Sequence, residues 1–360
     1  MRRHYLRKLI AFLSLSTGLT ALSQASAQTV EQFYKGKTIT VLVGTSPGGI
    51  NDITARFASR HLSRFIPGSP TLSVQYTPGG GGLVTANRIY NASEPDGLTL
   101  AKLERATPQL AVQGHPQVKF DPMKFVWLGS LSSYGDDAYL MLLNQDTPIN
   151  SVEDLRAGSP NKITLGANNA ASSNLIFGVI AKEALSLNVN VVRGYTGAAP
   201  MFLAMQRKEI DGQFVGISSV KTGQRPMWEK RAFKVPVVFG RTSRHPEFPN
   251  VPTGRELTKD PQMLALIDFA EIPFFMSLPF VGPPGMPADR AKALQDAFMA
   301  MCRDKDVLAE AAKLGIEMSP IDAAEIMRLL ARMSATPKEV IARYNSLGSK
   351  TELRKGAKGK

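Results

Sequence analysis

Hydrophobic positions along the chain alternate between the spacing of strands and the spacing of helices. Short apolar runs rich in β-branched residues predict strands at 38–44, 162–167, 190–195, 212–218 and 235–240. Apolar residues at helical spacing follow the first three runs, and two longer amphipathic patterns, at 289–314 and 322–344, predict helices near the C-terminus. This alternation is typical of parallel sheets with helices on both faces. The sequence therefore predicts an α/β fold, and its 360 residues suggest two lobes.

The first 27 residues have the three-part order of a secretory signal peptide. Basic residues within 1–8 precede an apolar run at 9–22, and Ala25-Ser26-Ala27 then supplies small residues at a cleavage site. The alternative is an N-terminal anchor, which the short apolar run disfavours, since a membrane span needs about eighteen apolar residues or more. We expect cleavage after Ala27 and a periplasmic mature protein, because no later segment reaches that length.

The formal net charge of +13 comes largely from the two ends of the chain. The N-terminal segment and the tail at 350–360 are both basic, and the body between them is only modestly so. Basic residues are not interleaved with aromatic residues in any one segment, so a nucleic-acid partner is not expected. The single cysteine, Cys302, excludes an intramolecular disulfide, and the four histidines are scattered. We therefore expect no metal and no cofactor.

Three predicted strand-to-helix turns, at 45–52, 168–174 and 195–200, carry small and polar residues that suit an anion. Glycines let the backbone approach a ligand, and free N–H groups at a helix N-terminus favour a carboxylate or phosphate. One such turn is more often ordinary loop, but three at the C-terminal ends of strands favour a ligand site. The candidate ligand-binding residues in these turns are Ser46, Pro47, Gly48, Gly49, Asn51, Asn168, Ser172, Ser173, Tyr195, Thr196, Gly197, Ala198 and Ala199.

Two glycine-containing motifs suggest other functions. Residues 44–48 match the G-x-S-x-G elbow of serine hydrolases, but the oxyanion hole needs the N–H of the residue after the serine, and Pro47 has none. His245, the one late histidine, has no clear acid partner in the sequence. The glycine run at 79–82 fits neither a dinucleotide nor a Walker motif, and it predicts a turn into a helix at 83–90. A secreted hydrolase using Ser46 remains the alternative hypothesis.

Several segments resemble, in order, the motifs of Bug-type (TctC-like) receptors. These receptors are the periplasmic solute-binding components of tripartite tricarboxylate transporters. The resemblance extends over nearly the whole mature chain. The matching segments are Ser46-Pro47-Gly48-Gly49 with Asp52, then 78–82, 95–100, 120–122, 195–199, 210–211, 244–253 and 281–287.

The resemblance implies a two-lobed, type II-like periplasmic binding protein, each lobe a mixed sheet flanked by helices, with the ligand cleft between them. One lobe would combine 28–129 with 241–345, the other would hold 130–240, and 346–360 would form a basic tail. Backbone amides of Ser46–Gly49 and Gly197–Ala199 would hold a ligand carboxylate, with Ser172 and Ser173 reaching it from the other lobe. The implied partners are a small carboxylate and the membrane permease subunits. The receptor would be a monomer, and it would not be an enzyme.

Two departures from the family pattern bear on the ligand. Many members have an aspartate four residues after the position of Asp211, used with amino- or amide-bearing ligands, and here that residue is Val215. Glu104 and Arg105 stand where many members have small residues. Arg105 could bind a second ligand carboxylate, or it could form a surface ion pair with an acid such as Glu104. We therefore expect an organic mono- or dicarboxylate, taken up by a permease or, alternatively, sensed by an orphan receptor that signals to a sensor protein.

Overall fold

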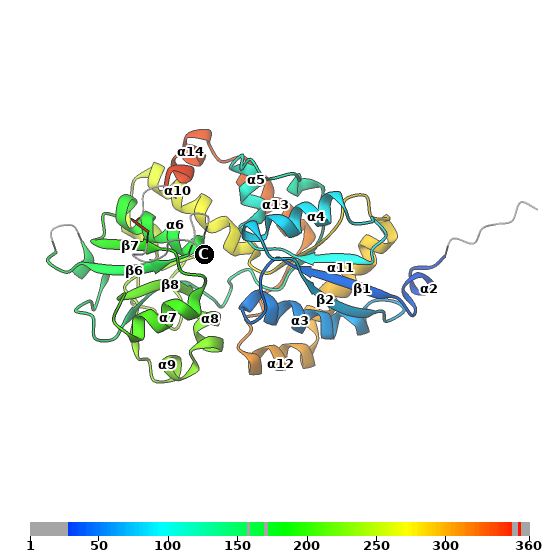
Figure 1. Ribbon diagram of the computed structural model, residues 1–360, viewed down its shortest axis with the longest axis horizontal. Helices are drawn as coiled ribbons and strands as arrows, with labels where there is room; N and C mark the ends of the chain where they lie inside the picture. The colour runs from blue at the N-terminus through cyan, green and yellow to red at the C-terminus, as the bar shows by residue number, and fades with distance from the viewer. Residues whose placement is uncertain (1–27, 157–158, 169–171, 348–351, 354–360) are drawn as a thin grey trace, which may run out of the picture.

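The computed structural model describes residues 28–156, 159–168, 172–347 and 352–353. The expected signal peptide, most of the basic tail and residues 169–171 of the second turn lie outside these residues. The described chain forms two lobes, each built on a mixed β-sheet with helices on its faces (Figure 1). Within the described chain, no helix is both long enough and apolar enough to cross a membrane.

The first sheet holds the N-terminal strands together with two strands from late in the sequence. Its described strands are, in spatial order, β12 (Ile321–Asp322), β4 (Val126–Ser130), β11 (Pro279–Gly282), β3 (Thr99–Lys102), β1 (Thr38–Val43) and β2 (Thr71–Tyr76). β1 is parallel to β2 and β3, whereas β11 is antiparallel to both β3 and β4. Helices α3 (Ile50–Leu62), α4 (Leu83–Asn91) and α11 (Ala288–Arg303) pack against this sheet.

The second sheet is built from the middle of the chain. Its described strands are, in spatial order, β10 (Val238–Phe239), β5 (Tyr139–Asn144), β8 (Gly212–Gly216), β6 (Ile163–Ala167), β7 (Val189–Arg193) and β13 (Glu352–Leu353), with β9 (Phe233–Lys234) also on β5. Helices α6 (Ser173–Val179) and α7 (Ala198–Gln206) pack on it. β5 is antiparallel to β8, so this sheet is mixed, as the first one is. Mixed sheets are what the family resemblance implies, whereas the hydrophobic pattern predicts parallel sheets. The hydrophobic pattern alone did not reveal strands that return from the other lobe.

Both long C-terminal helices of the sequence prediction are interrupted. The first is divided into α11 and α12 (Lys305–Leu314), because the Asp304 carboxylate accepts the N–H groups of Asp306 and Val307 and so begins a new helix. The second is divided into α13 (Ala323–Ser334) and α14 (Lys338–Leu347) next to Pro337, whose ring supplies no N–H to continue α13. A hydrophobic period alone does not record where one helix ends and the next begins.

Two predicted strands are shorter than expected. The run at 212–218 forms β8 only as far as Gly216, and helix α8 (Ile217–Gly223) starts at the next residue. The run at 235–240 contributes only β10, because Pro236 cannot donate to a ladder. The glycine run does lead into a helix as predicted: Gly79 to Gly82 all have positive φ, and α4 follows directly.

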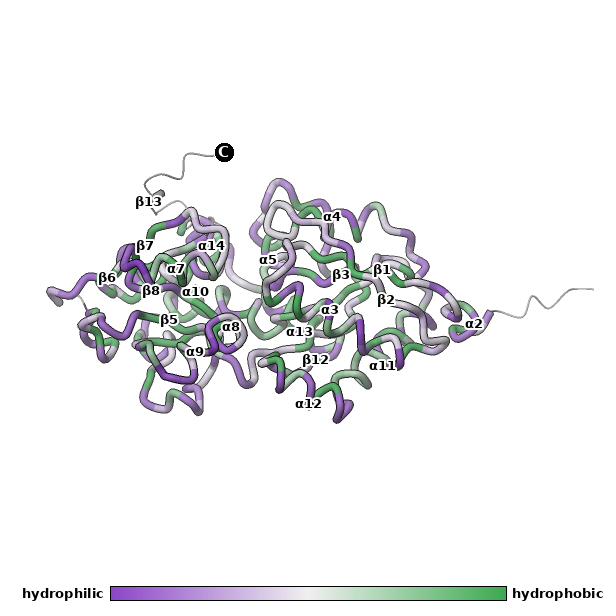
Figure 2. The backbone as a smooth tube through the Cα atoms, turned by 60° about the horizontal axis from the view of Figure 1, so that its bottom comes forward, coloured by the Kyte–Doolittle hydropathy of each residue, from purple (hydrophilic) through white to green (hydrophobic). Residues whose placement is uncertain are grey.

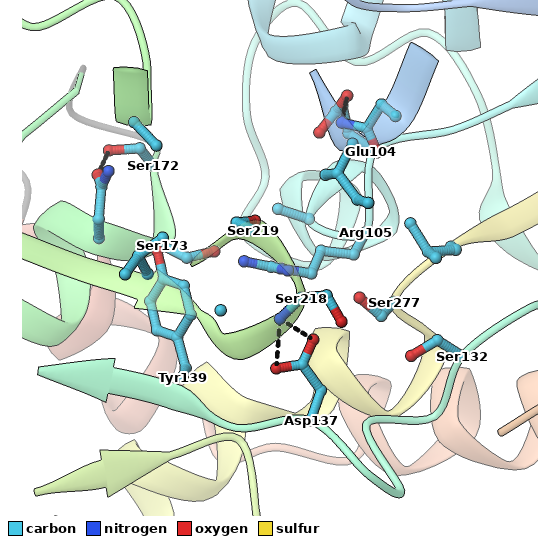
Figure 3. Close-up of a pocket in the computed structure, with 18 of the residues that line it drawn as sticks. Glu104, Arg105, Ser132, Asp137, Tyr139, Ser172, Ser173, Ser218, Ser219 and Ser277 are labelled. Atoms are coloured by element: carbon cyan, nitrogen blue, oxygen red, sulfur yellow. Dashed lines mark hydrogen bonds between the residues drawn. The ribbon is translucent and has the colours of Figure 1, made fainter. Parts of the chain in front are cut away.

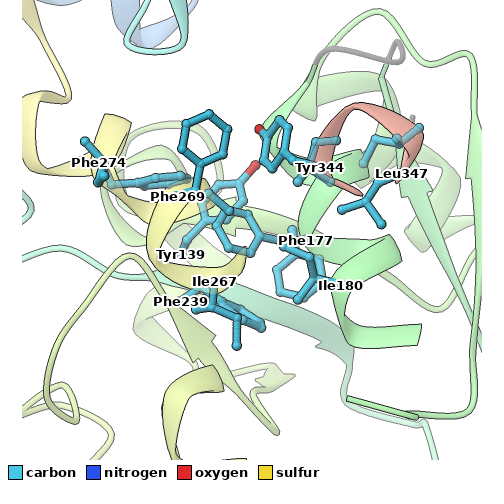
Figure 4. Close-up of a cluster of buried hydrophobic side chains, with 14 of the residues drawn as sticks. Tyr139, Phe177, Ile180, Phe239, Ile267, Phe269, Phe274, Tyr344 and Leu347 are labelled. Carbon is cyan, nitrogen blue, oxygen red and sulfur yellow. The ribbon is translucent and has the colours of Figure 1, made fainter. Parts of the chain in front are cut away.

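Apolar residues are concentrated in the strands and in the helices that face them (Figure 2). An aromatic cluster, composed of Tyr139, Phe177, Phe214, Phe239 and Phe274, joins the second sheet to the segment that returns to the first (Figure 4). The ring centroids of Phe177 and Phe239 are 4.7 Å apart, and those of Tyr139 and Phe274 are 4.8 Å apart. Phe274 belongs to the turn at Ile272–Met276, which leads directly into β11. The cluster therefore forms an apolar surface at the junction of the two lobes, and we call this surface the aromatic floor.

Candidate functional site

A cavity of about 380 Å³ lies between the two lobes, at the ends of their strands (Figure 3). The first lobe supplies residues from the turns after β1 and β3, and the second supplies residues from the turns after β6 and β8. Ligands in open α/β sheets bind outside the carboxyl ends of strands, and this cavity has that position.

The turn after β1 reaches the cavity through Thr45 and Asn51. Ser46 to Gly49 are exposed and do not line the cavity. Gly49 is the N-cap of α3, and the Gly48 N–H donates to Asp52 Oδ2 at 2.7 Å. Asp52 is fully buried and also accepts the Tyr76 hydroxyl at 2.6 Å. Burial disfavours its ionised form, but hydrogen bonds from Tyr76 and Gly48 and the charge of Arg56 outweigh this and lower its pKa. Asp52 therefore fixes the start of α3.

The turn after β6 is held by hydrogen bonds among its own side chains. The Asn174 carboxamide oxygen accepts the Ser172 hydroxyl at 2.7 Å and the Asn168 N–H at 3.1 Å. The Asn174 amide in turn donates to Asn168 Oδ1 at 3.1 Å. Asn168, Ser172, Ser173 and Asn174 all line the cavity. This network holds the N-terminal end of α6, with Ser172 and Ser173, at the cavity wall.

The turn after β7 brings the N-terminus of α7 to the cavity. Ala198, the first residue of α7, lines the cavity, while Gly197 is its extended N-cap and provides no side-chain cap. Tyr195 is buried in the core of the second lobe. Tyr195, Thr196, Gly197 and Ala199 are not among the cavity-lining residues. The uncapped start of α7 supplies partial positive charge at this edge of the cavity.

Arg105 extends into the cavity over the aromatic floor (Figure 3). Its guanidinium carbon lies 3.8 Å from the centroid of Phe274 and 5.3 Å from that of Tyr139. In the described part of the chain Arg105 forms no ion pair with a carboxylate, and Glu104 instead accepts a hydrogen bond from Asn51 Nδ2 at 2.5 Å. Stacking on aromatic faces and a hydrogen bond with the Tyr139 hydroxyl hold the guanidinium in one orientation, and its remaining N–H groups are available to a planar anion.

The cavity also contains acidic residues that the sequence did not single out. Asp137, only 4% exposed, accepts the Ala138 N–H at 2.7 Å and the Ser218 N–H at 3.3 Å, so it caps the start of α8. Glu317 accepts the Asp136 N–H at 3.2 Å. Burial raises the pKa of both carboxyl groups. Because the Asp137 carboxylate occupies the N-terminus of α8, that helix end does not offer its amides to an anion.

Apolar side chains complete the cavity. Val215 lines the wall beside Phe214 and Tyr139, and Leu110 and Leu278 face them from the first lobe. The residue at position 215 therefore presents a hydrocarbon surface where an aspartate would present a charge. This arrangement suits a ligand with an apolar body and an anionic group near Arg105.

Of the residues predicted from sequence, Asn51, Arg105, Asn168, Ser172, Ser173 and Ala198 line the cavity together. The lining residues that sequence reasoning missed include Ser132, Asp137, Ser277 and Glu317. A signal existed for the first two, since polar residues at 132–137 directly follow the buried strand β4. Ser277 and Glu317 come from irregular segments late in the chain, where no motif marks them. The ligand contacts themselves stay a prediction.

The serine hydrolase hypothesis has no support in the geometry. Ser46 is exposed outside the cavity, and His245, which also does not line the cavity, contacts the Asp136 carbonyl through its Nε2 at 3.2 Å. Of the described residues, no cluster of three or more histidine, cysteine, aspartate or glutamate side chains could hold a metal ion.

Two mixed sheets with a cavity between them define the class of two-lobed solute-binding proteins. Residues 55–346 match the family model described as the tripartite tricarboxylate transporter family receptor, TctC. The chain belongs to this family, as the sequence resemblance suggested. The family and the fold are those of periplasmic solute-binding proteins and not of enzymes.

Comparisons with individual proteins agree with this assignment. A UPF0065 protein of Bordetella pertussis is 26% identical over 301 residues, which cover 82% of this chain and 84% of the relative. A ligand-free TctC solute-binding protein from Polaromonas superposes with a TM-score of 0.63 at 19% identity, covering 88% of this chain and 99% of that one.

Two structural neighbours contain bound ligands. MatC of Rhodopseudomonas palustris with bound malate has a TM-score of 0.58 at 21% identity, over 87% of this chain and 99% of its own. Rpa4515 of R. palustris with adipate has a TM-score of 0.61 at 17% identity, over 86% and 97%. At these identities the likeness shows the fold.

Proposed function

We propose that this protein captures a small organic carboxylate in the periplasm and delivers it to the permease subunits of a tripartite transporter. The observation that carries the proposal is the cavity between the lobes, where the Arg105 guanidinium lies on an aromatic floor with no carboxylate paired to it. A guanidinium held in this way binds a carboxylate through two parallel hydrogen bonds.

The walls of the cavity support an acid with a hydrocarbon body. Val215, Phe214 and Leu110 offer apolar contact, and the uncapped N-terminus of α7 offers a second position for negative charge. Two structural neighbours hold malate and adipate, which are both dicarboxylates. The ligand class that fits best is a mono- or dicarboxylate without an amino group.

Location and partners follow from the same proposal. The receptor is exported, cleaved after Ala27, and works as a monomer that docks on the permease after closing on its ligand. Mass spectrometry of the protein purified from periplasm gives the mature N-terminus, and size-exclusion chromatography with light scattering gives the mass in solution.

A thermal-shift screen tests carboxylate binding. The panel contains malate, adipate, hexanoate, benzoate and citrate, with methyl esters of the same acids as controls that lack the anionic group. We expect at least one acid to raise the melting temperature, because a ligand that binds only the folded state stabilises it in proportion to the logarithm of its concentration. The matching ester should have no effect.

The proposal is overturned if no acid shifts the melting temperature and protein purified under native conditions carries no organic acid by mass spectrometry. An ester that stabilises as well as its acid would also contradict it, since the binding energy would then come from the apolar body alone.

A further inference from the structure

The cavity wall of the first lobe conceals a buried lysine. Lys102 is the last residue of β3, and its side chain is 1% exposed. Within the described part of the chain its ammonium forms no ion pair, and its hydrogen bond goes to the side-chain oxygen of Asn51. Burying an ammonium without a carboxylate partner costs free energy, so we expect an anion to bind nearby.

Hydrogen bonds connect this ammonium to the cavity. Lys102 donates to Asn51 Oδ1, and Asn51 Nδ2 donates to Glu104 Oε1 at 2.5 Å, while Asn51 and Glu104 both line the cavity. The ammonium thereby fixes the Asn51 carboxamide with its oxygen toward Lys102 and its NH2 group toward Glu104.

Two buried hydroxyls on the same edge of the sheet have no hydrogen-bond partner among the described residues. They are Thr45 Oγ1, after β1, and Thr107 Oγ1, after β3, and Thr107 is fully buried. Thr45 lines the cavity beside Asn51. Buried hydroxyls without partners are rare in native proteins, and at Thr45, which lines the cavity, this points to a ligand atom as the missing partner. Thr107 does not line the cavity.

We propose that Lys102 is a positioning residue for the ligand carboxylate, holding Asn51 in its binding orientation and supplying the positive charge on which a carboxylate beside Thr45 and Asn51 depends. The proposal rests on the carboxylate-receptor function above and adds a second cationic position to that of Arg105. A dicarboxylate would then place one group near Arg105 and the other at the Thr45–Asn51 edge.

The electrostatic surroundings of Lys102 make its protonation sensitive to a ligand. Burial lowers the pKa of Lys102 to about 8, the charge of Glu104 opposes this, and that of Arg105 adds to it. From the neighbouring elements, α3 contributes the neutral Asn51, while β1 and β11 place Val43 and Phe280 beside it in register. A bound carboxylate favours the charged form, so binding raises the pKa of Lys102 and takes up a proton near pH 8.

The sign of the pH dependence follows. Affinity for a carboxylate is highest below pH 8, where Lys102 is already charged, and it decreases as the pH rises through the pKa of the free protein. A lysine that only stabilised the fold would give no such dependence.

The test follows Lys102 by NMR in protein labelled with ¹³C-lysine, with the Lys102→Arg spectrum used for assignment. The pH titration is run in sodium chloride and in sodium acetate of equal concentration, acetate being the probe. We expect a midpoint near pH 8 in chloride and a higher midpoint in acetate. A midpoint at the ordinary lysine value, or the same midpoint in both salts, overturns the proposal.

Variants separate positioning from stability. Lys102→Met keeps the length and removes the charge, and it should weaken acetate binding roughly tenfold at pH 7 and abolish the pH dependence, with no loss of thermal stability. Lys102→Arg should retain most of the affinity. Lys234→Met is the matched control, because among the described residues Lys234 likewise donates one hydrogen bond, to the Thr147 carbonyl, and it lies outside the cavity.

The outcomes distinguish this proposal from the receptor function. If the panel of acids fails while acetate still shifts the Lys102 midpoint, the receptor function is rejected and the anion-sensing lysine stands. If an acid binds equally well to wild type and to Lys102→Met across pH 7 to 9, the role of Lys102 is rejected and the receptor function stands.

Discussion

Arg105 is a residue whose surroundings specify its chemistry. The aromatic rings of Phe274 and Tyr139 support the guanidinium from one side, so its donors face the cavity. We predict that Arg105→Ala weakens adipate roughly ten- to a hundredfold, as expected for the loss of charge-assisted hydrogen bonds. Hexanoate should be weakened far less, because its single carboxylate can bind at the Thr45–Asn51 edge instead. Isothermal titration calorimetry with both acids measures the difference.

Arg105→Lys is the control for charge without the planar fork, and we expect it to recover only part of the adipate affinity. Equal losses for adipate and hexanoate in Arg105→Ala would show that the residue only shapes the cavity.

Gly197 tests the third turn. A Cβ at this position would meet no atom within 4 Å, and its φ of 164° is extended backbone that any residue adopts. We predict that Gly197→Val folds with unchanged stability and loses carboxylate binding at least tenfold, because the added methyl groups fill the space in front of the Ala198 N–H. Paired thermal-shift and calorimetric measurements check both parts.

Gly223→Val is the matched control, since Gly223 also has open space around it and lies outside the cavity. Full affinity in Gly197→Val would remove the third turn from the binding site.

At the scale of elements, α10 (Pro261–Glu271) ends in a buried carboxyl group that links it to the segments at Gly240 and Arg255. Glu271 accepts the Gly240 N–H at 2.9 Å, next to β10, and the Arg255 Nε–H at 2.6 Å. Burial raises the pKa of Glu271 to about 7, although Arg255 opposes this. The folded state therefore favours the protonated form more than the unfolded chain does.

This shift predicts a pH dependence of stability. The contribution of Glu271 is fully present below its unfolded pKa of 4.5 and is lost as the pH rises through about 7, a change of about 3 kcal/mol. Glu271→Gln has no carboxyl group to titrate at this position. Its free energy of unfolding should therefore increase relative to that of the wild type as the pH rises from 4.5 to 7. Urea unfolding at several pH values measures the difference, and a constant offset between the two proteins would contradict the prediction.

The elements also show what local pattern can and cannot predict. The turns after β1, β6 and β7 were found because small polar residues follow an apolar run at each place. The division of the C-terminal helices at Asp304 and Pro337 depends on single residues that a hydrophobic period passes over. Ser277 and Glu317 reach the cavity only because β11 and β12 return to the first sheet. These strands pair with partners far away in the sequence, so no local pattern predicts the pairing.

At the scale of the whole molecule, the two lobes share more than the cavity. Ser133 in the segment between β4 and β5 meets Ser319 through a hydroxyl contact of 3.0 Å, and a Cβ at Gly315 would lie 3.3 Å from Thr222 of α8. These contacts join the second lobe to the loops after α12. A change in the angle between the lobes must therefore alter the cavity wall at Glu317, which lies between Gly315 and Ser319.

The position of β11 also sets an order of events during synthesis. β11, at Pro279–Gly282, lies between β3 and β4, so the centre of the first sheet is missing until the ribosome has made the chain as far as Gly282. β1, β2 and β3 can pair with one another early, but β3 and β4 must wait for β11, which follows β4 by about 150 residues, and such distant pairing is slow. For a protein of a periplasmic family this delay is useful, since a chain whose first sheet is incomplete is easier to thread through a membrane for export.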